Sequence, residues 1–245
     1  NDHGIIIDTA CRMRRQFDYA IRQLEELTKK RFDYDRLSEV MEVSNSTCRW
    51  WKKSTELAMH KPSPLSGFDM FNYMVVCMRG NKDGETLFRL WYEELEERMK
   101  QNLGPWNNAE EKYRIMWDGI ACWPHLATTF KTLKKYGVNM VASTYPDSWN
   151  IRYEKNDLDA LVRAYASHYA NRSIAYSVDN IAKIAEDYSL DGIIFHSNRS
   201  CKLMKFSARY SREPESLLFS STVIRQIHAF SQMLNMRLAF RLLSS

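Results

Sequence analysis

The second half of the sequence alternates between two kinds of apolar pattern. Three short apolar runs are typical of buried strands, at residues 113–117, 138–143 and 191–196. Between and after them, apolar residues recur at helical spacing over 123–136, 158–169 and 178–188. Strands that alternate with helices favour an α/β fold, in which a parallel sheet is covered by helices. A further helix is expected from about residue 220 to the end.

The first hundred residues predict helices without strands. Apolar residues three and four positions apart predict a helix over 9–30, with Asp8 as its N-cap, and further helices over 35–59, 68–78 and 85–100. In the last of these, Leu87, Leu90, Trp91 and Leu95 are expected on the buried face, and the acidic residues mostly on a solvated face. The composition changes at 102–108, so we divide the chain into a helical region, 1–103, and an α/β domain, 104–245.

The segments that follow the three strands are the candidate functional sites. In open parallel sheets, ligands bind beyond the carboxyl ends of the strands. Here those ends are followed by residues 117–125, 143–149 and 196–202, all rich in polar and aromatic side chains. A loop with this composition is more often functional than a short, bland one.

Cys201 is the sharpest single candidate. It follows a buried strand, and the neighbouring cations Arg199 and Lys202 favour a thiolate, which can act as a nucleophile or as a ligand to a soft metal such as iron. The alternative is an inert loop thiol. His196, taken alone, is more often a structural histidine than a ligand or base, and the two cations either bind a phosphate or face water.

Several other functions find no support in the sequence. Neither dinucleotide- nor triphosphate-binding glycine motifs nor a Gly-x-Ser-x-Gly elbow occurs. The net charge of +5 is scattered, so no nucleic-acid partner is predicted. No apolar run is long enough to span a membrane. The five cysteines lie far apart, which indicates a reducing cytoplasm rather than a disulfide framework, and most of them are expected to be buried.

Four segments carry a resemblance to a known family. Residues 191–202 (DGIIFHSNRSCK) form the longest of these, and residues 111–120, 130–134 and 61–68 support it. Together they resemble the 2-hydroxyacyl-CoA dehydratase / benzoyl-CoA reductase family, in order along the chain from about residue 8 to 205. The resemblance implies a flavodoxin-like parallel sheet covered by helices, with helical additions, in one subunit of a heterodimer.

The resemblance also implies a cofactor and an activity. A [4Fe-4S] cluster is held by three cysteines, of which Cys201 matches one, and it receives an electron from an ATP-dependent iron–sulfur activator protein. The electron passes to the thioester of a 2-hydroxyacyl-CoA, and the resulting ketyl radical expels the 2-hydroxyl group. This implies radical-based syn-elimination of water from an (R)-2-hydroxyacyl-CoA. His196, Ser197, Asn198 and Arg199 are the residues expected at the substrate or around the ligand cysteine.

The sequence departs from the family pattern in two places. Nothing in it is similar to the N-terminal domain, which supplies the other two cluster cysteines, so we expect this chain to lack that domain and to be inactive alone. The strand expected after the cysteine helix is also missing between residues 209 and 217. Two alternatives therefore stay open: a benzoyl-CoA-reductase-type subunit, or a relative without a cluster that serves as a CoA-binding module or scaffold.

Overall fold

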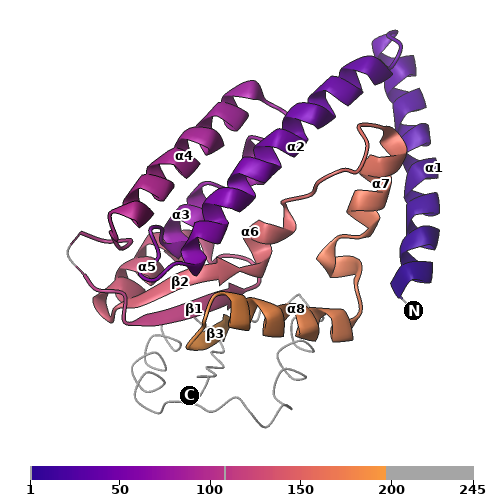
Figure 1. Cartoon of the computed structure of the whole chain (residues 1–245). Coiled ribbons are helices and arrows are strands. Elements are labelled where there is room, and N and C mark those ends of the chain that lie inside the picture. The colour runs from indigo at the N-terminus through magenta and orange to yellow at the C-terminus, as the bar shows by residue number, and fades with distance from the viewer. Residues whose placement is uncertain (1, 108, 197–245) are drawn as a thin grey trace.

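The computed structural model describes residues 2–107 and 109–196, in which long helices stand on a small sheet (Figure 1). The predictions for Ser197, Asn198, Arg199, Cys201 and the last helix lie outside these residues. The described elements, with η for short 3-10 helices, are α1 (Asp2–Thr28), α2 (Tyr34–Glu56), η1 (Leu57–Met59), α3 (Gly67–Asn72), η2 (Val75–Cys77), α4 (Lys82–Lys100), β1 (Tyr113–Asp118), η3 (Trp123–His125), α5 (Leu126–Lys135), β2 (Val138–Ser143), α6 (Thr144–Ser148), α7 (Leu158–Ala166), η4 (Tyr169–Asn171), α8 (Ile174–Asp187) and β3 (Gly192–Phe195).

The three described strands form a parallel sheet in the order β2-β1-β3. Every residue of β2 and β3 is buried, as are all but the first residue of β1. Strands covered on both faces read as continuous apolar runs, because neither face meets water. The predicted α/β architecture, with a helical region before a parallel sheet flanked by helices, is confirmed.

One core joins the sheet to the helices around it. Helices α3 and α5 pack on β2, and Ile181 and Ala185 of α8 belong to the same core. At the start of α3, a Cβ on Gly67 would clash with the side chain of Met140 in β2. A glycine there lets the helix start lie directly on the strand. The same core includes Ala58, Leu65 and Leu95 from the first hundred residues, so the division at residue 103 stays a prediction.

The helical region corrects two details of the prediction. Helix α1 begins at Asp2 and runs through Asp8, which is therefore no N-cap. In α4 the buried stripe runs through Phe88 and Leu95, while Leu90 lies off this stripe and is 52% exposed. The acidic face of α4 is solvated as predicted, since Glu93, Glu94 and Glu97 are exposed and Glu96 is intermediate.

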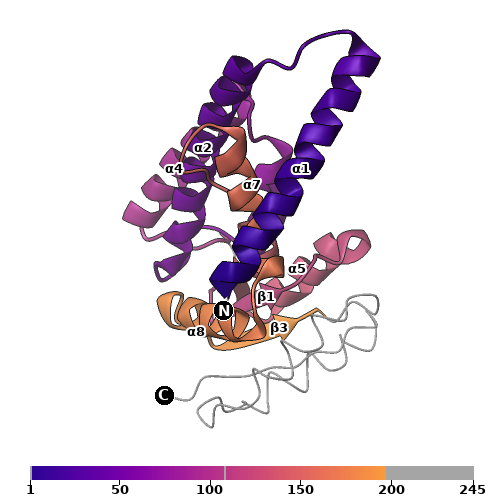
Figure 2. The ribbon, with the colours of Figure 1, turned by 90° about the vertical axis from the view of Figure 1, so that its right-hand side faces the viewer.

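The far end of α1 carries apolar residues that no described element covers. Its first part packs on α7, where Ala10 and Ile21 are buried against Leu158 and Val162. Beyond that contact, Leu24 and Leu27 are 55% and 79% exposed, because this end of the helix extends away from α7 (Figures 1 and 2). Helical spacing therefore predicted the helix correctly but not the burial of its last turns.

Two further expectations can be compared with the described residues. Of their four cysteines, Cys48 is buried, Cys122 is intermediate, and Cys11 and Cys77 are exposed. The prediction that most thiols are buried is wrong for these four, since two of them lie on the outer sides of helical segments. Within residues 2–196, no helix is long and apolar enough to cross a bilayer.

Candidate functional site

The carboxyl edge of the sheet brings together groups from all three strand ends. Asp118 ends β1 and pairs in register with Phe195 of β3, so that the His196 amide donates a 2.9 Å hydrogen bond to the Asp118 carbonyl oxygen. Thr144, just after β2, donates from its hydroxyl to Asp118 Oδ1 at 2.6 Å. The Thr144 oxygen in turn accepts from the Gly119 amide at 3.3 Å. The edge picked out by the strand-end rule is therefore one connected site.

Asp118 is a buried carboxyl group at the centre of this edge. The residue is only 3% exposed, and its sole side-chain partner among the described residues is the Thr144 hydroxyl. Burial raises the pKa of Asp118 above its ordinary value, and the Thr144 hydrogen bond opposes the shift only in part. A carboxyl group in this setting can hold a proton and donate a hydrogen bond.

His196 is the one predicted site residue that the structure describes. Its Nδ1 lies within hydrogen-bond distance of the Ile120 carbonyl oxygen, and its ring packs on Trp117 with centroids 5.8 Å apart. A carbonyl can only accept, so Nδ1 carries the proton and Nε2 of a neutral ring is left as an acceptor. These contacts fix the ring, as the structural reading required, and leave one nitrogen for chemistry.

The metal prediction rests on Cys201, outside the described residues. Among residues 2–107 and 109–196, no group of three or more His, Cys, Asp or Glu side chains could hold a metal ion. Cys122, after β1, is the one described cysteine in a segment that follows a strand end. A cubane cluster takes three or four thiolates. The described residues alone therefore do not fit the cluster.

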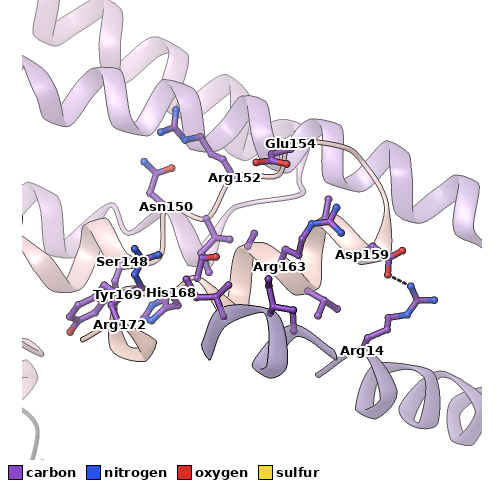
Figure 3. Close-up of a pocket in the computed structure, with 18 of the residues that line it drawn as sticks. Arg14, Ser148, Asn150, Arg152, Glu154, Asp159, Arg163, His168, Tyr169 and Arg172 are labelled. Atoms are coloured by element: carbon purple, nitrogen blue, oxygen red, sulfur yellow. Dashed lines mark hydrogen bonds and ion pairs between the residues drawn. The ribbon is translucent and has the colours of Figure 1, made fainter. Parts of the chain in front are cut away.

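A large pocket lies between α1, α7 and the segments before α7 and α8 (Figure 3). Its volume is about 1270 Å³. Asp147 and Ser148, in the segment that follows β2, form part of its wall, so the strand-end rule had located its beginning. Five arginines and three carboxylates contribute to the lining: Arg14, Arg15, Arg152, Arg163, Arg172, Asp147, Glu154 and Asp159.

Sequence reasoning missed these arginines. Each stands alone among polar residues, so each looks like ordinary exposed surface, and only the path of the chain brings them together. The one available signal was the recurrence of Arg152, Arg163 and Arg172 at intervals of nine to eleven residues through a single polar stretch.

Helix α2 and Arg79 hold the loop on one side of this pocket. The Arg79 guanidinium donates to the carbonyl oxygens of Trp149 and Ile151 at 3.3 and 3.2 Å, and also to the Tyr153 hydroxyl. Asn45 of α2 accepts from the Tyr153 amide at 2.8 Å. A charged donor that satisfies several carbonyls fixes a loop that has no secondary structure of its own.

The sequence profile of the family described as 2-hydroxyglutaryl-CoA dehydratase, D-component, matches residues 9–213. The chain belongs to this family. Curated relatives agree with the assignment. The chain is 45% identical over 199 residues to the (R)-2-hydroxyisocaproyl-CoA dehydratase alpha subunit of Clostridioides difficile, which covers 78% of this chain and 48% of the relative.

Two further relatives show the breadth of the family. Identity is 39% to the alpha subunit of lactoyl-CoA dehydratase of Anaerotignum propionicum, over 78% of this chain and 46% of the relative. It falls to 27% for one subunit of the benzoyl-CoA reductase of Thauera aromatica, over 78% and 49%. The chain spans about half the length of the curated relatives that it matches.

One of the segments that resembles the dehydratase family, 111–120, has a structural role visible here. Arg114 of β1 forms a buried ion pair with Glu111, with Nη1 and Oε1 2.6 Å apart. The same guanidinium donates to backbone carbonyls of Ala58, His60 and Tyr188. This dehydratase-family segment thus ties the central strand both to the helical region and to the end of α8.

Proposed function

We propose that this chain is part of an alpha-type subunit of an (R)-2-hydroxyacyl-CoA dehydratase. The observation that carries the proposal is the 45% identity to the alpha subunit of such an enzyme. The carboxyl-edge site is in keeping with it, because Asp118 and His196 offer a buried proton-holding group and a fixed imidazole where parallel sheets bind ligands. The reaction proposed is elimination of water from a 2-hydroxyacyl-CoA to give the 2-enoyl-CoA.

A [4Fe-4S] cluster is proposed as the cofactor of the complete subunit, with Cys201 as one of its ligands. The further ligands have to come from outside the described residues, since these do not supply a thiolate set. When bound, the cluster supplies the single electron for the radical elimination. Ser197, Asn198 and Arg199 are proposed to contact the substrate or to surround the ligand cysteine.

The proposal includes partners and a location. Relatives are named as alpha subunits, which supports a heterodimer with a second, unlike subunit. An ATP-dependent iron–sulfur activator protein is proposed as the electron donor. The wide spacing of the cysteines supports a reducing cytoplasm as the location.

A dehydratase is preferred to a benzoyl-CoA reductase because of the identities. The chain is 37–45% identical to four dehydratase alpha subunits but 27% identical to the reductase subunit. The dehydratases share no single acyl group by name, so the acyl chain of the substrate is not assigned.

The test uses the full-length subunit, purified without oxygen together with its second subunit and the activator. Expected are conversion of an (R)-2-hydroxyacyl-CoA to the enoyl-CoA, and iron and sulfide bound to the complex. Cys201→Ser should abolish both, while Cys77→Ser, which changes an exposed cysteine on η2, should retain both. An iron-free complex without turnover, or a Cys201→Ser complex with full iron, would contradict the proposal.

A further inference from the structure

The arginine-lined pocket is separate from the strand-end groups Asp118 and His196, and its charge balance points to an anionic ligand. Asp159 is already paired with Arg14 and Asp147 with Lys52, the latter at 2.8 Å. Glu154 is then the one lining carboxylate without an ion pair among the described residues. Like charges gathered around a cavity repel each other, and an anion removes that repulsion.

Three of the arginines have no carboxylate partner in the described part of the chain. Arg15 comes from α1, Arg152 from the loop before α7, and Arg163 from α7 itself. Figure 3 shows Arg163 between the loop that carries Arg152 and Glu154 and the helix that carries Arg14. A guanidinium binds phosphate with two parallel hydrogen bonds, so arginines from three segments suit a ligand with more than one phosphate group.

The size and the remaining lining favour more than a phosphate group alone. At about 1270 Å³ the pocket exceeds the range of roughly 300–1,000 Å³ that is common for small-molecule sites. One end carries the rings of His168, Tyr169 and Tyr176, which offer stacking surfaces for a base. The side-chain oxygen of Asn150 is buried there without a hydrogen-bond partner in the described part, so an amino or hydroxyl donor of a ligand can satisfy it.

We infer that this pocket binds the phosphorylated nucleotide of coenzyme A, with Arg152 and Arg163 on its phosphates. The inference rests on the proposed function, which supplies an acyl-CoA as substrate, and it assigns the nucleotide end of that substrate to a specific place. The loop 149–153 that carries Arg152 is the one fixed by Arg79. The pocket thereby receives a rigid wall before the ligand arrives, which lowers the entropic cost of binding.

The probe is adenosine 3′,5′-bisphosphate, which contains neither the acyl thioester nor the reacting carbon. We expect it to bind the 245-residue chain in calorimetric titrations, with an affinity that falls as salt is added. Arg163→Gln and Arg152→Gln should each raise its Kd by about tenfold, the loss typical of one charge-assisted contact. Arg89→Gln is the matched control, because Arg89 is exposed on α4, is absent from the pocket lining and carries the same charge; its Kd should stay within about twofold.

The outcomes separate this inference from the proposed function. No binding of the bisphosphate, or equal binding by Arg163→Gln and the parent, overturns the inference even if the full complex dehydrates its substrate. Inorganic pyrophosphate binding as tightly as the nucleotide overturns the assignment to a nucleotide. Arginine-dependent binding of the bisphosphate by a chain whose full complex shows no dehydration sustains the pocket while the proposed function fails. In an active complex, Arg163→Gln should raise KM for the acyl-CoA with kcat little changed.

Discussion

Replacing Arg114 by methionine tests how much of the fold depends on one buried guanidinium. The side chains of Arg114 and Glu111 are 5% and 4% exposed, so solvent barely screens their interaction. Methionine fills much of the same volume but removes the positive charge and all the donors. Glu111 is then left as a buried carboxylate, although it still accepts from the Asn139 amide at 2.7 Å.

The expected loss follows from the geometry of this pair. Breaking a buried ion pair by removing one partner costs about 3–5 kcal/mol, because the remaining charge has lost both water and its counter-ion. The carbonyls of Ala58, His60 and Tyr188 lose a charged donor at the same time, which places the expectation at the upper end of that range. Folded domains are stable by only about 5–15 kcal/mol, so this variant loses a large part of its stability.

Urea unfolding followed by tryptophan fluorescence measures the effect. With a slope of about 2–3 kcal/mol per molar urea, the midpoint should fall by about 1–2 M. Arg89→Met is the control, since Arg89 forms an exposed pair with Glu93 in which the two side chains are 44% and 52% exposed. Loss of such a pair costs less than about 1 kcal/mol.

A second variant isolates the ion pair from the other contacts of Arg114. In Arg114→Met combined with Glu111→Gln, neither charge is buried alone, so the double variant should be more stable than the sum of the single losses predicts, by about 1–3 kcal/mol. A single-variant loss under about 1 kcal/mol would refute the reasoning. Strict additivity in the cycle would show that the carbonyl contacts, and not the ion pair, account for the loss.

Three other substitutions test separate features. Burial raises the pKa of Asp118, so its folded form holds a proton that the unfolded chain releases; its contribution to stability is complete below the unfolded-state pKa of about 3.9 and is lost as pH rises through the higher folded-state value. Asp118→Asn should therefore gain in melting temperature relative to the parent between pH 4 and 8, and a constant difference would contradict this. Gly137→Ala should cost about 1–2 kcal/mol or more in urea unfolding, because Gly137 has φ +69° and an added Cβ would lie 2.9 Å from the Glu110 carbonyl oxygen; Gly104→Ala, whose Cβ would meet nothing closer than 3.6 Å, should be nearly neutral. Arg79→Met should speed amide hydrogen exchange of residues 149–153, and unchanged protection there would show that Arg79 does not hold the loop.

The sheet could be predicted from the sequence because its signal is local. A run such as 138–143 is apolar throughout most of its length, and such runs are expected where both faces of a strand are covered. Its predicted bounds coincide with β2. Helix α6 was missed, because Pro146 within it made residues 144–148 read as a loop.

Burial by distant parts of the chain left no such local signal. Leu24 and Leu90 have helical spacing but are exposed, since periodicity does not say whether another element covers the face. Asp118 reads as an ordinary loop carboxylate, and only the neighbouring strand ends bury it. The arginines of the pocket come from segments more than a hundred residues apart, which the sequence alone could not bring together.

The strand order has a consequence for synthesis on the ribosome. The central strand, β1, leaves the ribosome first, and its two neighbours follow it: β2 begins at Val138, and β3 only at Gly192. Until then one edge of an apolar strand stays unpaired, and exposed strand edges are where nascent chains aggregate. Arg114 adds to the delay, because the Tyr188 carbonyl that it binds emerges about as late as β3. The nascent sheet is therefore expected to need protection over roughly the last eighty residues before β3 is complete, at about 5–20 residues per second.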